Sequence, residues 1–178
     1  MPACIAMLRG VNVGGKTVPM ERLRASFAAL GFRQVKTCVQ SGNVVFDVRN
    51  GSAAGLAGKI ERQLRRDFGF AVPVFLKTSQ EMRDIVKRNP FLADPAIDHS
   101  KLHVTFLSAA APGTATTVLQ PLAEKPEQFR IRSREIYLYC PNGYGRTRLA
   151  NAAIEKKLSV AATTRNWRTV NALLALAR

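Results

Sequence analysis

The chain has 178 residues, of which 47% are hydrophobic and 22% are charged. That length suffices for one sizeable hydrophobic core or two small ones, and the composition is typical of a globular protein. Lysine and arginine number 27 against 12 acidic residues, which gives a formal net charge of +15. Such a surplus attracts polyanions, including nucleic acids, nucleotides and acidic lipid headgroups, although it also serves solubility alone.

Metal, disulfide and membrane chemistry find no support in the sequence. Cys4, Cys38 and Cys140 lie far apart, without CxxC or Cys/His ligand spacing, so we expect no metal site and no bound cofactor. Cys4 and Cys38 fall in apolar strands and are interpreted as buried hydrophobic residues. The apolar run at 3–8 ends at Arg9, and no apolar stretch approaches the ~20 residues that span a bilayer. We therefore expect a cytoplasmic protein that does not associate with membranes.

The first half of the chain predicts the element order β-α-β-β-α-β. Short apolar or alternating runs between turn residues predict strands at 3–8, 35–40, 44–48 and 72–76. One helix is expected from Pro19 to Gly31 and a second over about 53–68. Pro73 indicates that the fourth strand lies at a sheet edge, because proline cannot donate a ladder hydrogen bond.

The second half repeats a similar α/β order. Thr78 and Glu81 form a capping box that opens a helix over 79–88, and residues 89–100 form a connector. Further elements follow in chain order: a strand at 101–107, a helix near 115–123, strands at 128–132 and 135–140, a helix over about 148–157, and a last helix from about 165 to 177.

These elements predict an α+β protein with two ferredoxin-like, βαββαβ-type halves in one compact chain. The expected segments are a first half at 1–77, a helix and connector at 78–100, and a second half with the C-terminal helix at 101–178. In a ferredoxin-like sheet the strand order is 4-1-3-2 with antiparallel neighbours, so the end of strand 1 lies beside the start of strand 3.

The loop from Arg9 to Lys16 is the first candidate site, for an anion. Glycines let backbone N–H groups converge on an anion, Lys16 adds positive charge, and a helix begins just beyond. The candidate ligand residues of this loop are Arg9, Asn12, Gly14, Gly15 and Lys16. The predicted strand order brings the tight 40–43 hairpin to the same end of the sheet, where Gln40, Ser41 and Asn43 would add neutral donors. The alternative is that both segments are structural turns.

Two later segments are further candidates. The loop 141–148 joins a strand to a helix, and its Gly143, Tyr144, Gly145 and Arg146 suit a phosphate. Thr147 is interpreted as the N-cap of the helix that follows. The alternative is a cap and a turn only.

Thr164 is interpreted as the N-cap of the last helix, which places Arg165 and Asn166 in its first turn. A cation there opposes the helix dipole, which an anion or an internal carboxylate would explain. Trp167 is interpreted as a core residue.

The strands of the second half also alternate in polarity. We assign Leu102, Val104, Phe106, Phe129, Ile131, Ile136, Leu138 and Cys140 to one face of the sheet, and His103, Thr105, Arg130, Arg132, Tyr137 and Tyr139 to the other. A face with arginine and tyrosine resembles the sheets on which RNA-binding domains stack bases. The alternative is a face covered by helices or solvent.

Four segments together resemble a mainly bacterial family of uncharacterised proteins, catalogued as domain of unknown function 1697. They are LRGVNVGGK (8–16), QSGNVVF (40–46), PNGYGRTRL (141–149) and ATTRNWRTV (162–170). The resemblance covers essentially the whole chain and implies a two-subdomain α+β fold with ferredoxin-like halves. It implies no established activity, substrate or cofactor. Such proteins often carry Ser-Lys where this chain has Thr147-Arg148, which keeps the cation and changes its geometry.

The sequence leaves several functions open. No serine elbow, no His-centred ligand set and no carboxylate pair for acid–base work is visible, so no catalytic residue is named. We expect a basic binding protein for a phosphate-bearing small molecule, nucleotide or nucleic acid. The alternatives are an enzyme acting on a small anionic substrate near Lys16, Ser41 and Asn43, and a protein-interaction module. The oligomeric state is left open.

Overall fold

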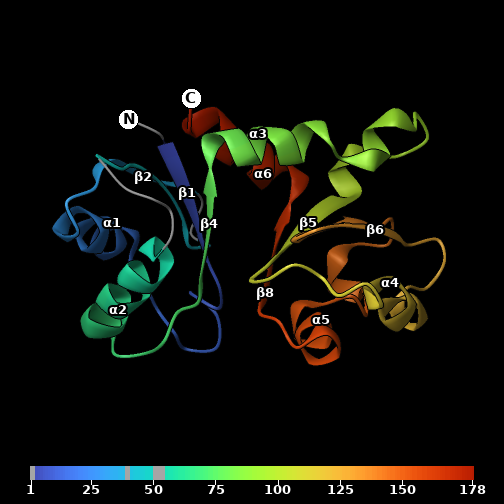
Figure 1. Cartoon of the computed structure of the whole chain (residues 1–178), viewed down its shortest axis with the longest axis horizontal. Helices are drawn as coiled ribbons and strands as arrows, with labels where there is room; N and C mark the ends of the chain where they lie inside the picture. Colours follow the sequence, from blue (N-terminus) through green and yellow to red (C-terminus); the bar gives the residue numbers. More distant parts are fainter. Residues whose placement is uncertain (1–2, 39–40, 50–54) are drawn as a thin grey trace. The chain divides into compact units, whose positions relative to one another are not determined.

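The computed structural model describes residues 3–38, 41–49 and 55–178 of the chain (Figure 1). Its contacts divide the chain into two compact units. The first unit comprises Met1–Asp84 together with Asn171–Arg178, and the second comprises Ile85–Val170. The division falls within two helices, α3 (Ser79–Lys87) and α6 (Trp167–Leu176). The segment boundaries expected at residues 77 and 100 stay a prediction.

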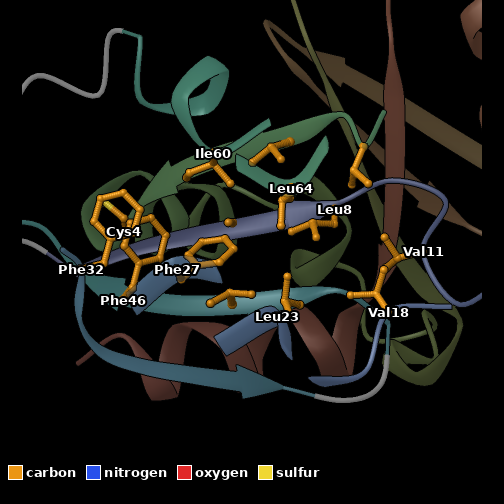
Figure 2. Close-up of a cluster of buried hydrophobic side chains, with 14 of the residues drawn as sticks. Cys4, Leu8, Val11, Val18, Leu23, Phe27, Phe32, Phe46, Ile60 and Leu64 are labelled. Atoms are coloured by element: carbon orange, nitrogen blue, oxygen red, sulfur yellow. The ribbon is translucent and has the colours of Figure 1, made fainter. Parts of the chain in front are cut away.

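The first unit contains a four-stranded antiparallel sheet with the order β2-β3-β1-β4. In chain order its elements are β1 (Ala3–Leu8), α1 (Met20–Ala29), β2 (Arg33–Cys38), β3 (Asn43–Asp47), α2 (Leu56–Phe68) and β4 (Val74–Thr78). Leu8 of β1 and Phe46 of β3 pack with Phe27 of α1 and Leu64 of α2 in one buried cluster (Figure 2). The two helices therefore cover one face of the sheet.

The second unit repeats this arrangement with the sheet order β6-β7-β5-β8. Its elements are β5 (Leu102–Leu107), α4 (Ala115–Leu119), β6 (Gln128–Arg132), β7 (Glu135–Tyr139), α5 (Asn151–Leu158) and β8 (Ala162–Asn166). Leu119 of α4 and Ile154 of α5 pack against Leu107 and Leu138 of the sheet. Both units thus have the predicted βαββαβ-type order and the 4-1-3-2 sheet of the ferredoxin-like arrangement, although the last strand of the second unit was not itself expected.

Most expected elements are present within a few residues, and α3 begins with the predicted capping box. The backbone N–H of Glu81 donates to Thr78 Oγ1 at 3.1 Å, and the N–H of Thr78 donates to Glu81 Oε2 at 2.7 Å. β4 lies at a sheet edge, as Pro73 indicated. Pro19 is the N-cap of α1 in extended conformation and not its first helical residue.

The strand β8 was not predicted, and it changes the role of two residues. Thr164 lies inside β8 and is not an N-cap, while Arg165 belongs to the strand and not to a helical turn. Asn166 caps α6 instead, because its Oδ1 accepts the backbone N–H of Thr169 at 2.8 Å. The two threonines of this strand resemble a capping signal, but their β-branched side chains also suit a strand.

Thr147 is likewise not the N-cap of α5, whose N-cap is Ala150. The Oγ1 of Thr147 accepts the N–H of Leu149 at 3.1 Å and donates to Glu127 Oε2 at 3.1 Å, so it closes the loop that precedes the helix. The physical reason is the extended stretch between Thr147 and α5, which delays the first helical turn.

The predicted sides of β6 and β7 are confirmed, whereas those of β5 are reversed. Val104 pairs with Tyr137, and Tyr137 pairs with Arg130, so these three side chains share one face. Thr105 pairs with Ile136 on the opposite, helix-covered face. A shift of one residue in the register moves every side chain of a strand to the other side of the sheet. The lengths of the predicted turns did not fix the register of β5 against β7.

The face that carries Tyr137 is covered and is not an open stacking surface. Tyr137 is 1% exposed, and its hydroxyl donates to the carbonyl oxygen of Ile85 at 2.9 Å. Burial raises the pKa of this phenol to about 12. The ring of Phe91 lies 6.3 Å from that of Tyr139, and the Arg130 guanidinium lies 5.6 Å from the Phe91 ring. Ile85 and Phe91 therefore cover Tyr137 and Tyr139 on this face.

Candidate anion-binding site

The loop from Arg9 to Val18 is anchored at both ends in the core of the first unit. Val11 and Val18 are 5% and 2% exposed, and both point into the cluster shown in Figure 2. Asn12 closes the loop, since its N–H donates to Lys16 O at 2.7 Å and its Oδ1 accepts the N–H of Val18 at 2.8 Å. This asparagine adopts a left-handed φ of 57°, which asparagine tolerates better than most residues. Asn12 is therefore a loop-forming residue.

Between these anchors the backbone faces solvent. Val13, Gly14, Gly15 and Lys16 are exposed, and φ is 58° at Gly14 and 80° at Gly15. Within the described residues, the N–H groups of Val13, Gly14 and Gly15 donate to no protein acceptor. Consecutive backbone donors in such a turn form a concave site that suits an anion. This loop therefore presents three free amides beside the Lys16 ammonium.

The β2–β3 hairpin meets this loop at the same end of the sheet, as the strand order predicted. The N–H of Leu8 donates to Gly42 O at 2.8 Å, and Met7 pairs with Asn43. Asn43 is fully buried, and its amide donates to Cys38 O at 3.1 Å and Ser41 Oγ at 2.9 Å. These donors hold the hairpin together and do not face a ligand. Gln40, also proposed as a donor, lies outside the described residues.

The glycine loop and the end of β1 contact the chain segment that follows α2. The Lys16 ammonium is 5.7 Å from the centre of the Phe70 ring, and the N–H of Arg9 donates to Pro73 O at 3.0 Å. Residues 71–73 border an open hollow of about 310 Å³, which we call the α2 hollow. Its lining residues are Gly58, Glu61, Arg62, Arg65, Ala71, Val72 and Pro73. The end of β1 and the α2–β4 connection therefore bring Lys16 close to this hollow.

The charge balance of the α2 hollow is positive. Arg62 and Arg65 are exposed, and within the part of the chain that the structure describes neither forms an ion pair. Glu61 is the acidic lining residue, and its Oε1 accepts the N–H of Val74 at 2.9 Å. That carboxylate is thus engaged by the backbone of β4. Neither arginine was among the residues selected from the sequence; their spacing of three residues was the available signal for a shared face.

The loop 141–148 in the second unit is closed by its own backbone. The N–H of Gly143 donates to Cys140 O at 2.9 Å, that of Arg146 to Gly143 O at 3.2 Å, and that of Thr147 to Tyr144 O at 3.2 Å. Gly143 takes a left-handed φ of 92°. Gly145 and Arg146 are exposed, and Arg146 forms no ion pair within the described residues. This loop is a compact turn with one free cation.

Tyr144 and Arg165 come together beside a histidine that sequence analysis did not select. The Tyr144 ring stacks on His103 with centroids 4.9 Å apart and an interplanar angle of 24°. The Arg165 guanidinium donates to Thr163 Oγ1 at 2.8 Å and to Thr164 O at 2.9 Å. Burial lowers the pKa of Arg165 to about 10, and its proximity to Tyr144 acts in the opposite direction. Burial also lowers the pKa of His103. The signal in the sequence that could have indicated this cluster is His103 itself, a histidine within a predicted strand.

The described residues show no other chemical centre. Among them, no group of three or more His, Cys, Asp or Glu side chains is placed to hold a metal ion. No helix among the described residues is long and apolar enough to cross a membrane. The three cysteines are free thiols, of which Cys38 is only half-buried. Burial raises the pKa of the Cys140 thiol to about 12, so it is a poor nucleophile near neutral pH.

Comparison with known proteins agrees with the fold and adds no activity. Conserved bacterial protein SP0830 from Streptococcus pneumoniae has a similar structure, with a TM-score of 0.73 and 20% sequence identity over 99% of each chain. No curated protein matches the chain. The family model described as protein of unknown function (DUF1697) matches residues 1–137, which is most of the chain. The chain therefore belongs to the DUF1697 family.

Proposed function

We propose that this protein binds phosphate-bearing ligands, and that the glycine loop and the α2 hollow of the first unit form the site. The observation that carries this proposal is the set of Val13–Gly15 amides that have no acceptor among the described residues, together with Lys16 and with two arginines of the nearby hollow that form no ion pair there. Backbone amides and arginines both donate to phosphate oxygens, and arginine does so in bidentate geometry. The net charge of +15 adds a long-range attraction for any polyanion.

The competing interpretations have weaker support. The exposed large hydrophobic side chains among the described residues are Val13 and Leu92, which lie in different units and form no broad apolar patch for a protein partner. For an enzyme at the same corner, Asn43 is buried with its donors directed into the hairpin. Binding is therefore the function that the geometry of this corner favours.

The test compares two matched pairs of exposed helical cations. Arg62→Ala with Arg65→Ala removes the α2 pair, and Lys156→Ala with Lys157→Ala removes the same charge from α5. A charge-assisted contact contributes roughly 1.5–3 kcal/mol, so losing two should weaken tripolyphosphate binding by about 100-fold or more. The α5 pair acts through the general field only and should cost about fivefold or less.

Isothermal titration calorimetry with inorganic tripolyphosphate measures both variants under one buffer condition. Lys16→Ala should also weaken binding, by about tenfold or more, while leaving the free energy of unfolding nearly unchanged because the side chain is exposed. Equal losses from the α2 pair and the α5 pair would show diffuse attraction without a defined site, and would overturn the proposal.

A further inference from the structure

Two neighbouring aromatic rings, each with a cation beside it, form a row in the first unit. The Arg22 guanidinium of α1 lies 4.9 Å from the centre of the Phe68 ring. The Phe68 and Phe70 rings lie 6.4 Å apart with an interplanar angle of 40°, and the Lys16 ammonium lies 5.7 Å from the Phe70 ring. We call Arg22, Phe68, Phe70 and Lys16 the cation–ring row. It joins α1, the end of α2 and the glycine loop.

Two open hollows lie on different sides of α2, and the row borders the second of them through Arg22. The α2 hollow is bordered by Arg62 and Arg65, and a second hollow of about 330 Å³ is lined by Arg22, Ala25, Ser26, Ala29, Gln63 and Asp67. Residues 62 and 65 lie three apart on one helix side, while 63 and 67 lie four apart on another. A chain-like ligand that follows the row from Arg22 to Phe70 would therefore run from the second hollow toward Ala71 of the α2 hollow.

One acidic side chain borders the row, and its charge is largely compensated. The Asp67 carboxylate accepts two hydrogen bonds from Gln63 Nε2, at 3.1 and 3.0 Å. Hydrogen bonds from Ser26 and Gln63 hold the pKa of Asp67 below its ordinary value, and the nearby Arg66 and Arg22 act in the same direction. Arg22 also donates to the backbone oxygen of Asp67 at 2.8 Å. Asp67 thus fixes Arg22 beside the Phe68 ring.

We infer that the cation–ring row binds single-stranded nucleic acid, with bases against Phe68 and Phe70 and phosphates on Lys16, Arg62 and Arg65. This inference rests on the proposed phosphate-binding function. Both rings are half-buried, so each combines a core-packed edge with exposed surface. Proteins that bind single strands without sequence preference combine a cationic track with aromatic rings on which bases stack. A duplex hides its base faces, so only an unpaired strand uses the rings.

The experiment separates stacking from charge by measuring affinity against salt. Fluorescence anisotropy follows a labelled single-stranded oligonucleotide of about 12 residues, as DNA and as RNA, and the matching duplex. Phe70→Leu keeps an apolar side chain but removes the ring, and should weaken single-strand binding by about 5- to 150-fold without changing the salt slope. Arg62→Ala with Arg65→Ala should instead lower the slope of log K against log salt by about 1.4, or about 0.7 for each phosphate contact.

Two further variants keep the test decisive if Phe70→Leu also disturbs packing. Phe70→Trp retains a stacking ring and should bind at least as tightly as the natural chain. Tyr139→Leu removes a half-buried ring of the second unit and should leave binding within about twofold, because no contact of the row is lost. Thermal melting of each variant shows whether the fold is retained.

Two outcomes would overturn the inference: the duplex binding as tightly as the single strand, or Phe70→Leu binding as tightly as the natural chain. If either occurs while tripolyphosphate binding still depends on Arg62 and Arg65, the phosphate site stands and the stacking role is wrong. If the natural chain bound neither the oligonucleotide nor tripolyphosphate, the proposed function would be wrong as well. DNA and RNA are expected to bind alike, because stacking and phosphate contacts do not use the 2′-hydroxyl.

Discussion

The loops 9–18 and 141–148 look alike as sequences and differ as structures. Each combines glycines with a cation and precedes a helix. In the first, the amides of Val13–Gly15 face solvent without a protein acceptor. In the second, the amides of Gly143, Arg146 and Thr147 donate to carbonyls of the same turn. A glycine-rich loop is therefore an anion site only when its backbone donors remain available, and this is decided by where each N–H bonds.

The two loops also differ in how they are attached to their sheets. The first is pinned by the apolar Val11 and Val18 at its ends, which leaves its middle exposed. The second is held along its length, by the Tyr144 ring on His103 and by the buried Thr147. The first loop is thus anchored at its ends with its middle exposed to solvent, whereas the second is packed against its unit along its length. Three predictions test this difference.

The largest effect is expected at the contact between the first loop and the hairpin. A Cβ at Gly42 would lie 2.3 Å from Val11 Cγ2 and 3.0 Å from Leu8 Cβ, and φ there is +71°. Overpacking together with a left-handed backbone should cost Gly42→Ala about 3 kcal/mol of unfolding free energy. Gly145→Ala in the second loop meets nothing within 4 Å and serves as the control. Chemical denaturation measures both, and similar losses for the two variants would refute the described contact.

An intermediate effect is expected from the residues that close the two loops. Thr147→Val leaves the N–H of the buried Leu149 without its acceptor and Glu127 without its donor, at a cost of about 1–3 kcal/mol. Asn12→Ala removes the acceptor for Val18 N–H in a part-buried hydrogen bond and places alanine at a left-handed φ of 57°, so it should cost about 1–2 kcal/mol. Anion affinity should respond in the opposite order, falling for Asn12→Ala and not for Thr147→Val. Denaturation and tripolyphosphate titration check both halves of this prediction.

Much of the fold followed from the sequence because hydrophobic periodicity and turn residues are local signals. The βαββαβ order, the 4-1-3-2 sheets and the edge position of β4 were all predicted. β8 was missed because its stability depends on distant partners: it pairs with β5, and Thr164 Oγ1 lies 2.7 Å from Thr105 Oγ1. The two sides of β5 were reversed, while those of β6 and β7 were right, because alternation fixes which residues share a strand side but not how β5 aligns with β7.

The candidate site was only partly visible in the sequence. Lys16, Gly14 and Gly15 were selected because they are consecutive in the sequence and together suit an anion. Phe70, Arg62 and Arg65 were not, because their relation to Lys16 comes from the chain path after α2 and from the contact between Arg9 and Pro73. The opposite error concerns Asn43, whose polar side chain suggested a ligand contact and is buried in the hairpin. The sequence therefore identifies the polar and aromatic side chains, but the fold determines which of them lie close together.

The smallest effect is expected from the way the second loop is packed on His103. The Nδ1 of His103 lies 3.3 Å from Lys101 O, so in the neutral tautomer this nitrogen carries the proton and donates. Burial lowers the pKa of the folded imidazole below its ordinary value of about 6.5. As pH falls through 6.5 the unfolded chain therefore takes up a proton first. The stabilisation is complete above that pH and is lost progressively between 6.5 and the lower folded pKa.

His103→Phe should reduce this loss, because phenylalanine keeps a ring under Tyr144 and has no proton to bind. Unfolding free energies at several pH values between about 7 and 5 measure it, with His99→Phe at an exposed position as the control. We expect the His103 variant to lose less stability over this range than the natural chain, and the His99 variant to follow the natural chain. If His103→Phe shows the full loss, the second loop is not coupled to a buried neutral histidine. The contrast with the exposed first loop would then rest on backbone hydrogen bonds alone.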